Sequence, residues 1–239
     1  MASDLSGLTI KDEHLRRALE GQEYLLVDGA MGTQMQERGL DALEAVPELL
    51  CKTHAHDIAA IHTAYIAAGA EVITTNTFSA NRLKLGDKMS VEEAYRLAAD
   101  CARAAGAPYI AGDIGPTGSL LEPMGTLSFD EAYGIFAEQV RAAVAAGCDI
   151  ILIETMADLR EAKAALLAAR ENSTLPVFVT MTFGEDGRTF LGTTPEIAAE
   201  VLSSLGAQAV GFNCSLGPAE LVGAAHAMAS RVRCPLMAQ

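Results

Sequence analysis

Cys214 follows directly after a short apolar run and stands next to Asn213, with a glycine and a proline close behind. This pattern is typical of a buried parallel strand that runs into a loop at its carboxyl end. A thiol at such a place can serve as a metal ligand or as a nucleophile, because both roles use the thiolate. A free cysteine is more often a small buried hydrophobic residue, however. Cys214 alone therefore leaves the choice open.

Four more polar side chains end short apolar runs, namely Asp28, Asn76, Asp113 and Glu154. A carboxylate beside an apolar strand is costly to bury without a partner, so it must face a cation, a ligand or solvent. For each residue taken singly, a structural hydrogen bond is the simpler interpretation. The carboxyl ends of the strands of a parallel barrel meet on one face, which is where such folds carry their active sites. Taken together, these polar side chains are therefore predicted to converge on one site.

Asp28 also opens a loop, residues 28–33, that contains Gly29, Ala30 and a second glycine. Glycines allow backbone N–H groups to turn towards an anion such as a carboxylate. A plain tight turn has the same sequence, so the loop by itself is a weak signal. A longer Gly- and Pro-rich stretch, residues 115–125, follows Asp113, and loops of that length often form the wall or lid of a site.

The remaining cysteines and all five histidines are poorer candidates. Two of the cysteines fall within predicted helices, and two precede their strands and so lie at the opposite end of a barrel; they are Cys51, Cys101, Cys148 and Cys234. The histidines have no second type of ligand beside them at metal-binding spacing. We expect them to face solvent or to serve in packing.

A helix end, a glycine and a short β-rich run recur along the chain at Gly69, Gly106, Gly147 and Gly206. A period of about 40 residues between such glycines is typical of repeated βαβ units. Strands are predicted at residues 24–28, 72–76, 109–113, 150–154, 177–182, 209–213 and 236–239. A leading helix over residues 11–20 could plug the floor of a barrel. The sequence predicts an α/β fold, a (β/α)8 barrel with about seven of its strands, incomplete at its C-terminal end, in a single domain over residues 1–239.

Composition excludes several classes of protein. Half of the 239 residues are hydrophobic, which suffices for a sizeable core. The net charge of −14 disfavours nucleic acid and anionic membranes as partners. The first residues lack the apolar core of a signal peptide, so we expect a cytoplasmic location. The odd number of cysteines, five, argues against a disulfide framework.

Six motifs occur in a recognisable order: DGAMGT, TTNTFSANRLKLG, GDIGPTG, ETMADLREAKAAL, MTFGEDGRTFLGT and GFNCSLGP. Together they closely resemble the homocysteine S-methyltransferase family, and within it the homocysteine-binding module of cobalamin-dependent methionine synthases. The resemblance runs from about Leu25 to the last residue.

The resemblance implies a zinc enzyme on a (β/α)8 barrel that methylates homocysteine to methionine. Cys214 matches the first of three zinc-binding cysteines of the family. Glu154 would hold the amino group of homocysteine, and the loop of Asp28, Gly29 and Ala30 would receive its carboxylate. Asn76 and Asn213 would line the pocket. Zinc bound to the homocysteine sulfur would supply a thiolate at neutral pH.

The resemblance also implies partners. In the related enzymes the methyl group comes from methylcobalamin, itself charged by methyltetrahydrofolate, on cobalamin- and folate-binding modules. The adjacent cysteine pair that completes the family's zinc site has no match in this sequence. We therefore expect a truncated chain that binds zinc weakly or not at all and does not turn over alone, since one thiolate does not hold zinc tightly.

Two other functions stay open. The first is a non-catalytic barrel fragment or interaction module that a partner, or self-association through an open sheet edge, completes. The second is an unrelated magnesium-dependent barrel lyase or hydrolase that uses Asp28, Asp113 and Glu154, because carboxylates are the ligands that hard cations prefer.

Overall fold

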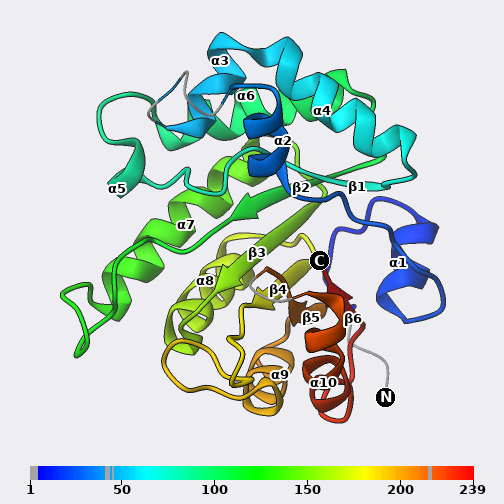
Figure 1. Cartoon of the computed structure of the whole chain (residues 1–239), viewed down its shortest axis with the longest axis vertical. Helices are drawn as coiled ribbons and strands as arrows, with labels where there is room; N and C mark the ends of the chain where they lie inside the picture. Colours follow the sequence, from blue (N-terminus) through cyan, green and yellow to red (C-terminus); the bar gives the residue numbers. More distant parts are fainter. Residues whose placement is uncertain (1–4, 41–43, 45, 215–216) are drawn as a thin grey trace.

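The computed structural model describes residues 5–40, 44, 46–214 and 217–239. Its six strands form one parallel sheet in the order of the sequence, which is the topology of a (β/α) barrel. Figure 1 shows the sheet curled, with helices around its outer side. The strands are β1 (Val72–Thr74), β2 (Tyr109–Ile114), β3 (Ile150–Met156), β4 (Val177–Met181), β5 (Ala209–Phe212) and β6 (Leu236–Ala238). The predicted α/β barrel fold is therefore confirmed.

The helices begin where the sequence supplies caps. Ser128 and Glu131 form a reciprocal capping box at the start of α7, and Thr194 caps α9 directly before a proline. Described in chain order, the helical elements are α1 (Glu13–Leu19), α2 (Met31–Glu37), η1 (Pro47–Leu49), α3 (Leu50–Thr53), α4 (Ala55–Ala67), α5 (Arg82–Leu85), α6 (Val91–Ala104), α7 (Phe129–Ala145), α8 (Leu159–Asn172), α9 (Pro195–Ser204) and α10 (Pro218–Ala229). No helix in the described part of the chain is long and apolar enough to span a membrane.

Helix α1 closes the floor of the barrel. Its Leu15 and Leu19 are buried against side chains that point inward from β1 to β6, among them Val72 and Met237. The hydroxyl of Tyr109 donates to the carboxylate of Asp12 at the start of the same helix, over 2.8 Å. The predicted plug over residues 11–20 is therefore present, with the helix itself at Glu13–Leu19.

The outer helices pack closely on the sheet because small residues face each other. A Cβ atom added to Gly112 of β2 would lie 2.7 Å from the Cβ of Ala143 on α7, which no pair of real side chains allows. Inward and outward positions alternate along each strand, so the inward set forms one cluster and the outward set joins the helices in another.

The prediction of a first strand over residues 24–28 needs correction. This segment runs beside β1 and forms a single isolated bridge, between Val27 and Val72. The N–H of Asp28 donates to the carbonyl of Val72 over 3.0 Å, and the N–H of Val72 donates to Leu26 over 3.1 Å. Its other edge faces a groove, and Tyr24 is 95% exposed. With one neighbour instead of two, the segment has the position of a strand without a regular ladder, so six strands stand where seven were predicted.

Candidate functional site

The inward side chains change from apolar to polar at the carboxyl ends of the strands. Below that level the interior is apolar, with residues such as Ala111, Leu152 and Phe178. Strand alternation then places the next inward positions at one level. These positions carry Thr74, Asp113, Glu154, Thr180 and Asn213. The sheet therefore gathers a polar layer from five strands on top of its apolar core.

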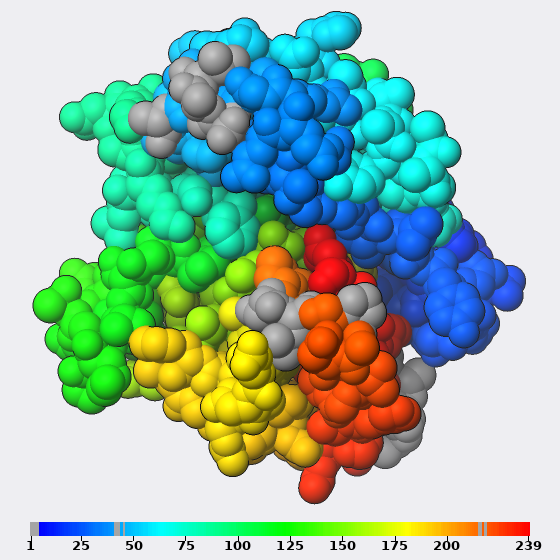
Figure 2. All heavy atoms as spheres, in the orientation of Figure 1, coloured from blue at the N-terminus to red at the C-terminus, as the bar shows by residue number. Residues whose placement is uncertain are grey.

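A cavity of about 520 Å³ lies over this layer. Six of the predicted site residues line it: Gly29, Ala30, Asn76, Glu154, Asn213 and Cys214. Asp113, Glu48 and Thr155 line it as well. Figure 2 shows this face hollowed between the N-terminal helices, in blue and cyan, and the C-terminal ones, in yellow and orange. The polar strand ends thus share one cavity.

Asp28 lies beside the cavity and is used structurally. Its carboxylate accepts hydrogen bonds from the backbone N–H of Thr74, over 2.9 Å, and from the Thr74 hydroxyl, over 3.0 Å. Burial raises the pKa of Asp28 to about 7, against the lowering effect of those donors. Asp28 therefore anchors the 28–33 loop to β1.

The loop approaches Tyr65 closely at its first glycine. A Cβ atom on Gly29 would lie 3.0 Å from the ring and the hydroxyl of Tyr65. That hydroxyl donates to the carbonyl of Ala30 over 3.2 Å. Tyr65 on α4 thus packs against the loop, and Ala30 leads directly into α2.

Two acids from the neighbouring strands β2 and β3, Asp113 and Glu154, line the cavity. Asp113 is 4% exposed, and its Oδ1 is buried with no hydrogen-bond partner among the described residues. Burial, and then the charges of Glu154 and Asp28, hold the pKa of Asp113 well above its usual range. Burial and then Asp28 raise the pKa of Glu154 to about 7. A cationic ligand that binds beside these buried carboxyl groups would favour their ionised forms and so be attracted to them.

Asn213 holds the end of β5 to its neighbours. Its Oδ1 accepts from the backbone N–H of Thr155 and from the hydroxyl of Thr180, both over 3.0 Å. Its Nδ2 donates to the Thr155 hydroxyl over 2.7 Å and to the Cys214 sulfur over 3.5 Å. Both polar atoms of the Asn213 side chain are thus used in hydrogen bonds within the protein. These bonds hold the thiol of Cys214 at the rim of the cavity.

Backbone strain marks the same corner. Thr155 and Cys214 have φ values of 58° and 60°, and they are the non-glycine residues with positive φ in the described chain. This conformation is a genuine outlier for a β-branched residue such as threonine. Strain of this kind persists where the surroundings enforce it, and it is enriched at functional sites.

Asn76 and Glu48 also line the cavity. The Asn76 amide donates to the carbonyl of Pro47 over 2.9 Å and to the sulfur of Cys51 over 3.6 Å. Glu48 is 1% exposed; one of its oxygens accepts from the N–H of Ser79 over 2.6 Å, and the other, Oε2, has no partner among the described residues. Burial raises the pKa of Glu48.

The residues present do not fit a zinc site. Cys214 is the exposed cysteine of the chain, and the other four are buried. Across residues 5–40, 44, 46–214 and 217–239, no group of three or more Cys, His, Asp or Glu side chains could hold a metal ion. A structural or catalytic zinc takes at least three protein ligands. We therefore derive no reaction step through zinc in this chain.

The histidines also lie outside the cavity. His14 on α1 contacts the carboxylates of Glu23 and Glu71, which raise its pKa in that order. His62 on α4 is fully buried, and neither ring nitrogen has a partner among the described residues. His62 thus agrees with the expected packing role, whereas His14 makes polar contacts with two carboxylates that were not expected.

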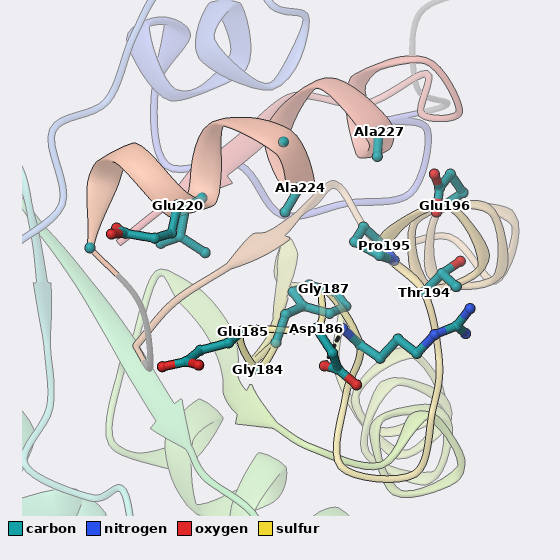
Figure 3. A pocket seen from close by; sticks show the side chains of 15 residues that line it. Gly184, Glu185, Asp186, Gly187, Thr194, Pro195, Glu196, Glu220, Ala224 and Ala227 are labelled. Atoms are coloured by element: carbon teal, nitrogen blue, oxygen red, sulfur yellow. Dashed lines mark hydrogen bonds between the residues drawn. The ribbon is translucent and has the colours of Figure 1, made fainter.

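A second hollow, of about 740 Å³, lies between the loop after β4 and helices α9 and α10. Figure 3 shows its acidic side chains, Glu185, Asp186, Glu196 and Glu220. Asp186 accepts a hydrogen bond from the N–H of Arg188 over 3.0 Å. None of the predicted site residues lines this hollow, and its acids come from loop and helix surfaces. The strand-end cavity is therefore the candidate site.

Among the cavity residues that sequence reasoning missed are Thr155 and Glu48. Thr155 follows Glu154 directly, so its position after a strand end was a usable signal. Glu48 stands in an ordinary apolar stretch, VPELL, and nothing in that pattern marks it.

Comparison with known proteins gives the relationship. The family model of homocysteine S-methyltransferase matches residues 25–239. Methionine synthases of Mycobacterium leprae and Mycobacterium tuberculosis are each 31% identical, over 90% and 96% of this chain and over 20% and 21% of their own lengths. The chain thus spans about a fifth of the length of these relatives.

Solved structures show the same fold. The oxidised form of the homocysteine methyltransferase MmuM from Escherichia coli matches with a TM-score of 0.83 and 20% identity, over 95% of this chain and 85% of that one. Its metallated form matches with a TM-score of 0.78 and 22% identity, over 95% and 86%. The family match covers the polar strand ends and the cavity above them, and on this ground the chain belongs to the homocysteine S-methyltransferase family.

Proposed function

We propose that this chain is the homocysteine-binding module of a methyltransferase of the methionine synthase type. The observation that carries the proposal is the polar layer of five strand ends beneath one cavity, in a chain of this family. The relationship to methionine synthases supports the choice of type. It also replaces the hypothesis of an unrelated magnesium-dependent lyase or hydrolase.

The residues of this chain would bind and orient the amino acid. Glu154 faces the cavity and would accept hydrogen bonds from the ammonium group of homocysteine. Backbone N–H groups of the loop that carries Gly29 and Ala30 would receive the carboxylate. This arrangement directs the thiol of the ligand towards the rim where Asn213 and Thr155 hold Cys214.

Methylation then requires the thiol to release its proton to solvent water and its sulfur to attack the methyl carbon. A sulfur–carbon bond forms, and the bond from the methyl group to its donor breaks with the electron pair staying on the donor. We propose methylcobalamin as that donor, carried on a cobalamin-binding module and recharged from methyltetrahydrofolate on a folate-binding module. Support for these partners comes from the methionine synthase relatives, which are about five times as long as this chain.

Titration calorimetry with L-homocysteine tests the proposal. We expect saturable binding to the chain that Glu154→Gln weakens at least about tenfold, because a hydrogen bond to a charged group is lost. L-Cysteine, which is one methylene shorter, should bind more weakly. An absence of binding to the unchanged chain at millimolar homocysteine would refute the function.

A further inference from the structure

Asp113 is a buried acid with one carboxyl oxygen that no donor among the described residues satisfies. Strand alternation on β2 points its side chain into the barrel, in line with Tyr109 and Ala111. It is 4% exposed and lines the cavity, and its Oδ1 has no partner among the described residues. The backbone N–H of Ile114 is the donor that favours its ionised form. A buried carboxyl oxygen without a donor costs free energy unless a ligand completes it.

Asp28 provides the contrast. It is equally deep in the barrel but takes two donors from Thr74. Thr74 thus satisfies Asp28 within the protein, whereas Asp113 is left for the cavity. Glu154, on the neighbouring strand β3, is partly exposed to that same cavity.

The charge around Asp113 and Glu154 favours a cation over an anion at this place. Glu48 also lines the cavity and Asp28 lies beside it, and none of the four acids forms an ion pair in the described chain. Lys84 is the cation whose charge acts on Glu48, and it is not among the residues that raise or lower the pKa of Asp113 or Glu154 most strongly. A metal ion is the poorer candidate, since no three of the described side chains form a ligand set. A primary ammonium group carries one positive charge and three N–H donors. It can therefore meet two carboxyl groups at once.

We propose that Asp113 is a second substrate-binding carboxyl, which together with Glu154 holds the ammonium group of the amino acid substrate. This inference rests on the proposed function and extends it, because Asp113 sits on a different strand from Glu154 and makes the ammonium site two-sided. Two-sided recognition selects amino acids with a free ammonium group against analogues in which that group is absent or acylated.

The test compares two ligands on three proteins by titration calorimetry. The ligands are L-homocysteine and 4-mercaptobutyrate, which is homocysteine without its ammonium group. The proteins are the unchanged chain, Asp113→Asn and Glu161→Gln. Glu161 is the matched control, because it is a buried acid outside the cavity that accepts from Thr117 over 2.6 Å.

Asp113→Asn should weaken the binding of homocysteine about 10- to 100-fold, the range for a lost charged hydrogen bond, and leave 4-mercaptobutyrate unchanged or tighter. Glu161→Gln should leave the affinity for both ligands unchanged. Thermal melting checks that each variant folds. The inference is wrong if Asp113→Asn weakens both ligands equally or leaves homocysteine unaffected. If the unchanged chain binds neither ligand, the proposed function itself fails, and the inference with it.

Discussion

Asn213 and Thr155 hold each other by two hydrogen bonds that run in opposite directions. The Thr155 N–H donates to Asn213 Oδ1 over 3.0 Å, and Asn213 Nδ2 donates to the Thr155 hydroxyl over 2.7 Å. The pair joins the end of β3 to the end of β5 across β4, whose Thr180 donates to the same Oδ1. Its strength decides how firmly Cys214 is placed.

Replacing Asn213 by alanine should lower the free energy of unfolding by about 1–3 kcal/mol, because the buried N–H of Thr155 and the hydroxyl of Thr180 lose their acceptor. Thr180→Val removes one of these bonds and should cost less. Urea denaturation of both variants measures the difference. Equal losses would show that the Thr155 pair contributes nothing of its own.

Glu154→Gln should change how stability depends on pH. The pKa of Glu154 is about 7 in the folded chain against an ordinary 4.5, so the folded state binds the proton more tightly. The contribution of protonated Glu154 to the free energy of unfolding is therefore fully present below about pH 4.5 and is lost as the pH rises through about 7. Denaturation midpoints should fall less from pH 5 to pH 8 in the variant than in the unchanged chain. Parallel pH curves would contradict this.

His62 should make stability depend on pH in the opposite direction from Glu154. Burial lowers its pKa to about 4 from an ordinary 6.5, so the unfolded state binds the proton more tightly and stability is lost as the pH falls from 6.5 to 4. His62→Leu should gain about 1–2 kcal/mol in the free energy of unfolding at pH 5 relative to pH 7.5. His56 is exposed on the same helix, and His56→Ala is the control. The same gain in both variants would rule out burial as the cause.

Zinc should bind poorly. After purification in zinc and gel filtration, elemental analysis should find well under one zinc ion per chain, with no change in Cys214→Ala, because one thiolate does not retain the metal. A stoichiometric zinc ion that Cys214→Ala removes would show that other groups complete the site, and activity assays would then be warranted.

The groove between residues 24–28 and β6 predicts self-association. It measures about 470 Å³ and exposes apolar side chains such as Leu26 along two backbone edges. Such edges pair with other chains. Light scattering should show a mass that rises with concentration, and Leu26→Lys should reduce that rise. Ile197→Lys, at an exposed position on α9, should not. A constant monomer mass would count against the alternative of an interaction module.

The alternation of helix caps, glycines and apolar runs predicted the barrel because each unit is local in sequence. Residues 24–28 went wrong because a regular strand also needs neighbours: the sequence predicted a barrel that lacks its last strand, but not that the first strand would lose its ladder as a result. Strand ends likewise predicted which side chains share the cavity. Which of these side chains has a structural role and which is left for a ligand depends on contacts between residues far apart in the sequence. Thr74 donates hydrogen bonds to Asp28, while Asp113 has an oxygen without a partner among the described residues. The single domain over residues 1–239 stays a prediction, as does the cytoplasmic location.

The floor helix α1 has a consequence for the order of folding. Leu15 and Leu19 are made before the strands, yet they pack against side chains from β1 to β6, from Val72 to the distant Met237. Contacts of such separation form late, because the intervening chain must be ordered first. Until these strands have been made and paired, α1 therefore lacks the surface that covers its apolar face, and the barrel interior stays open to water at its base.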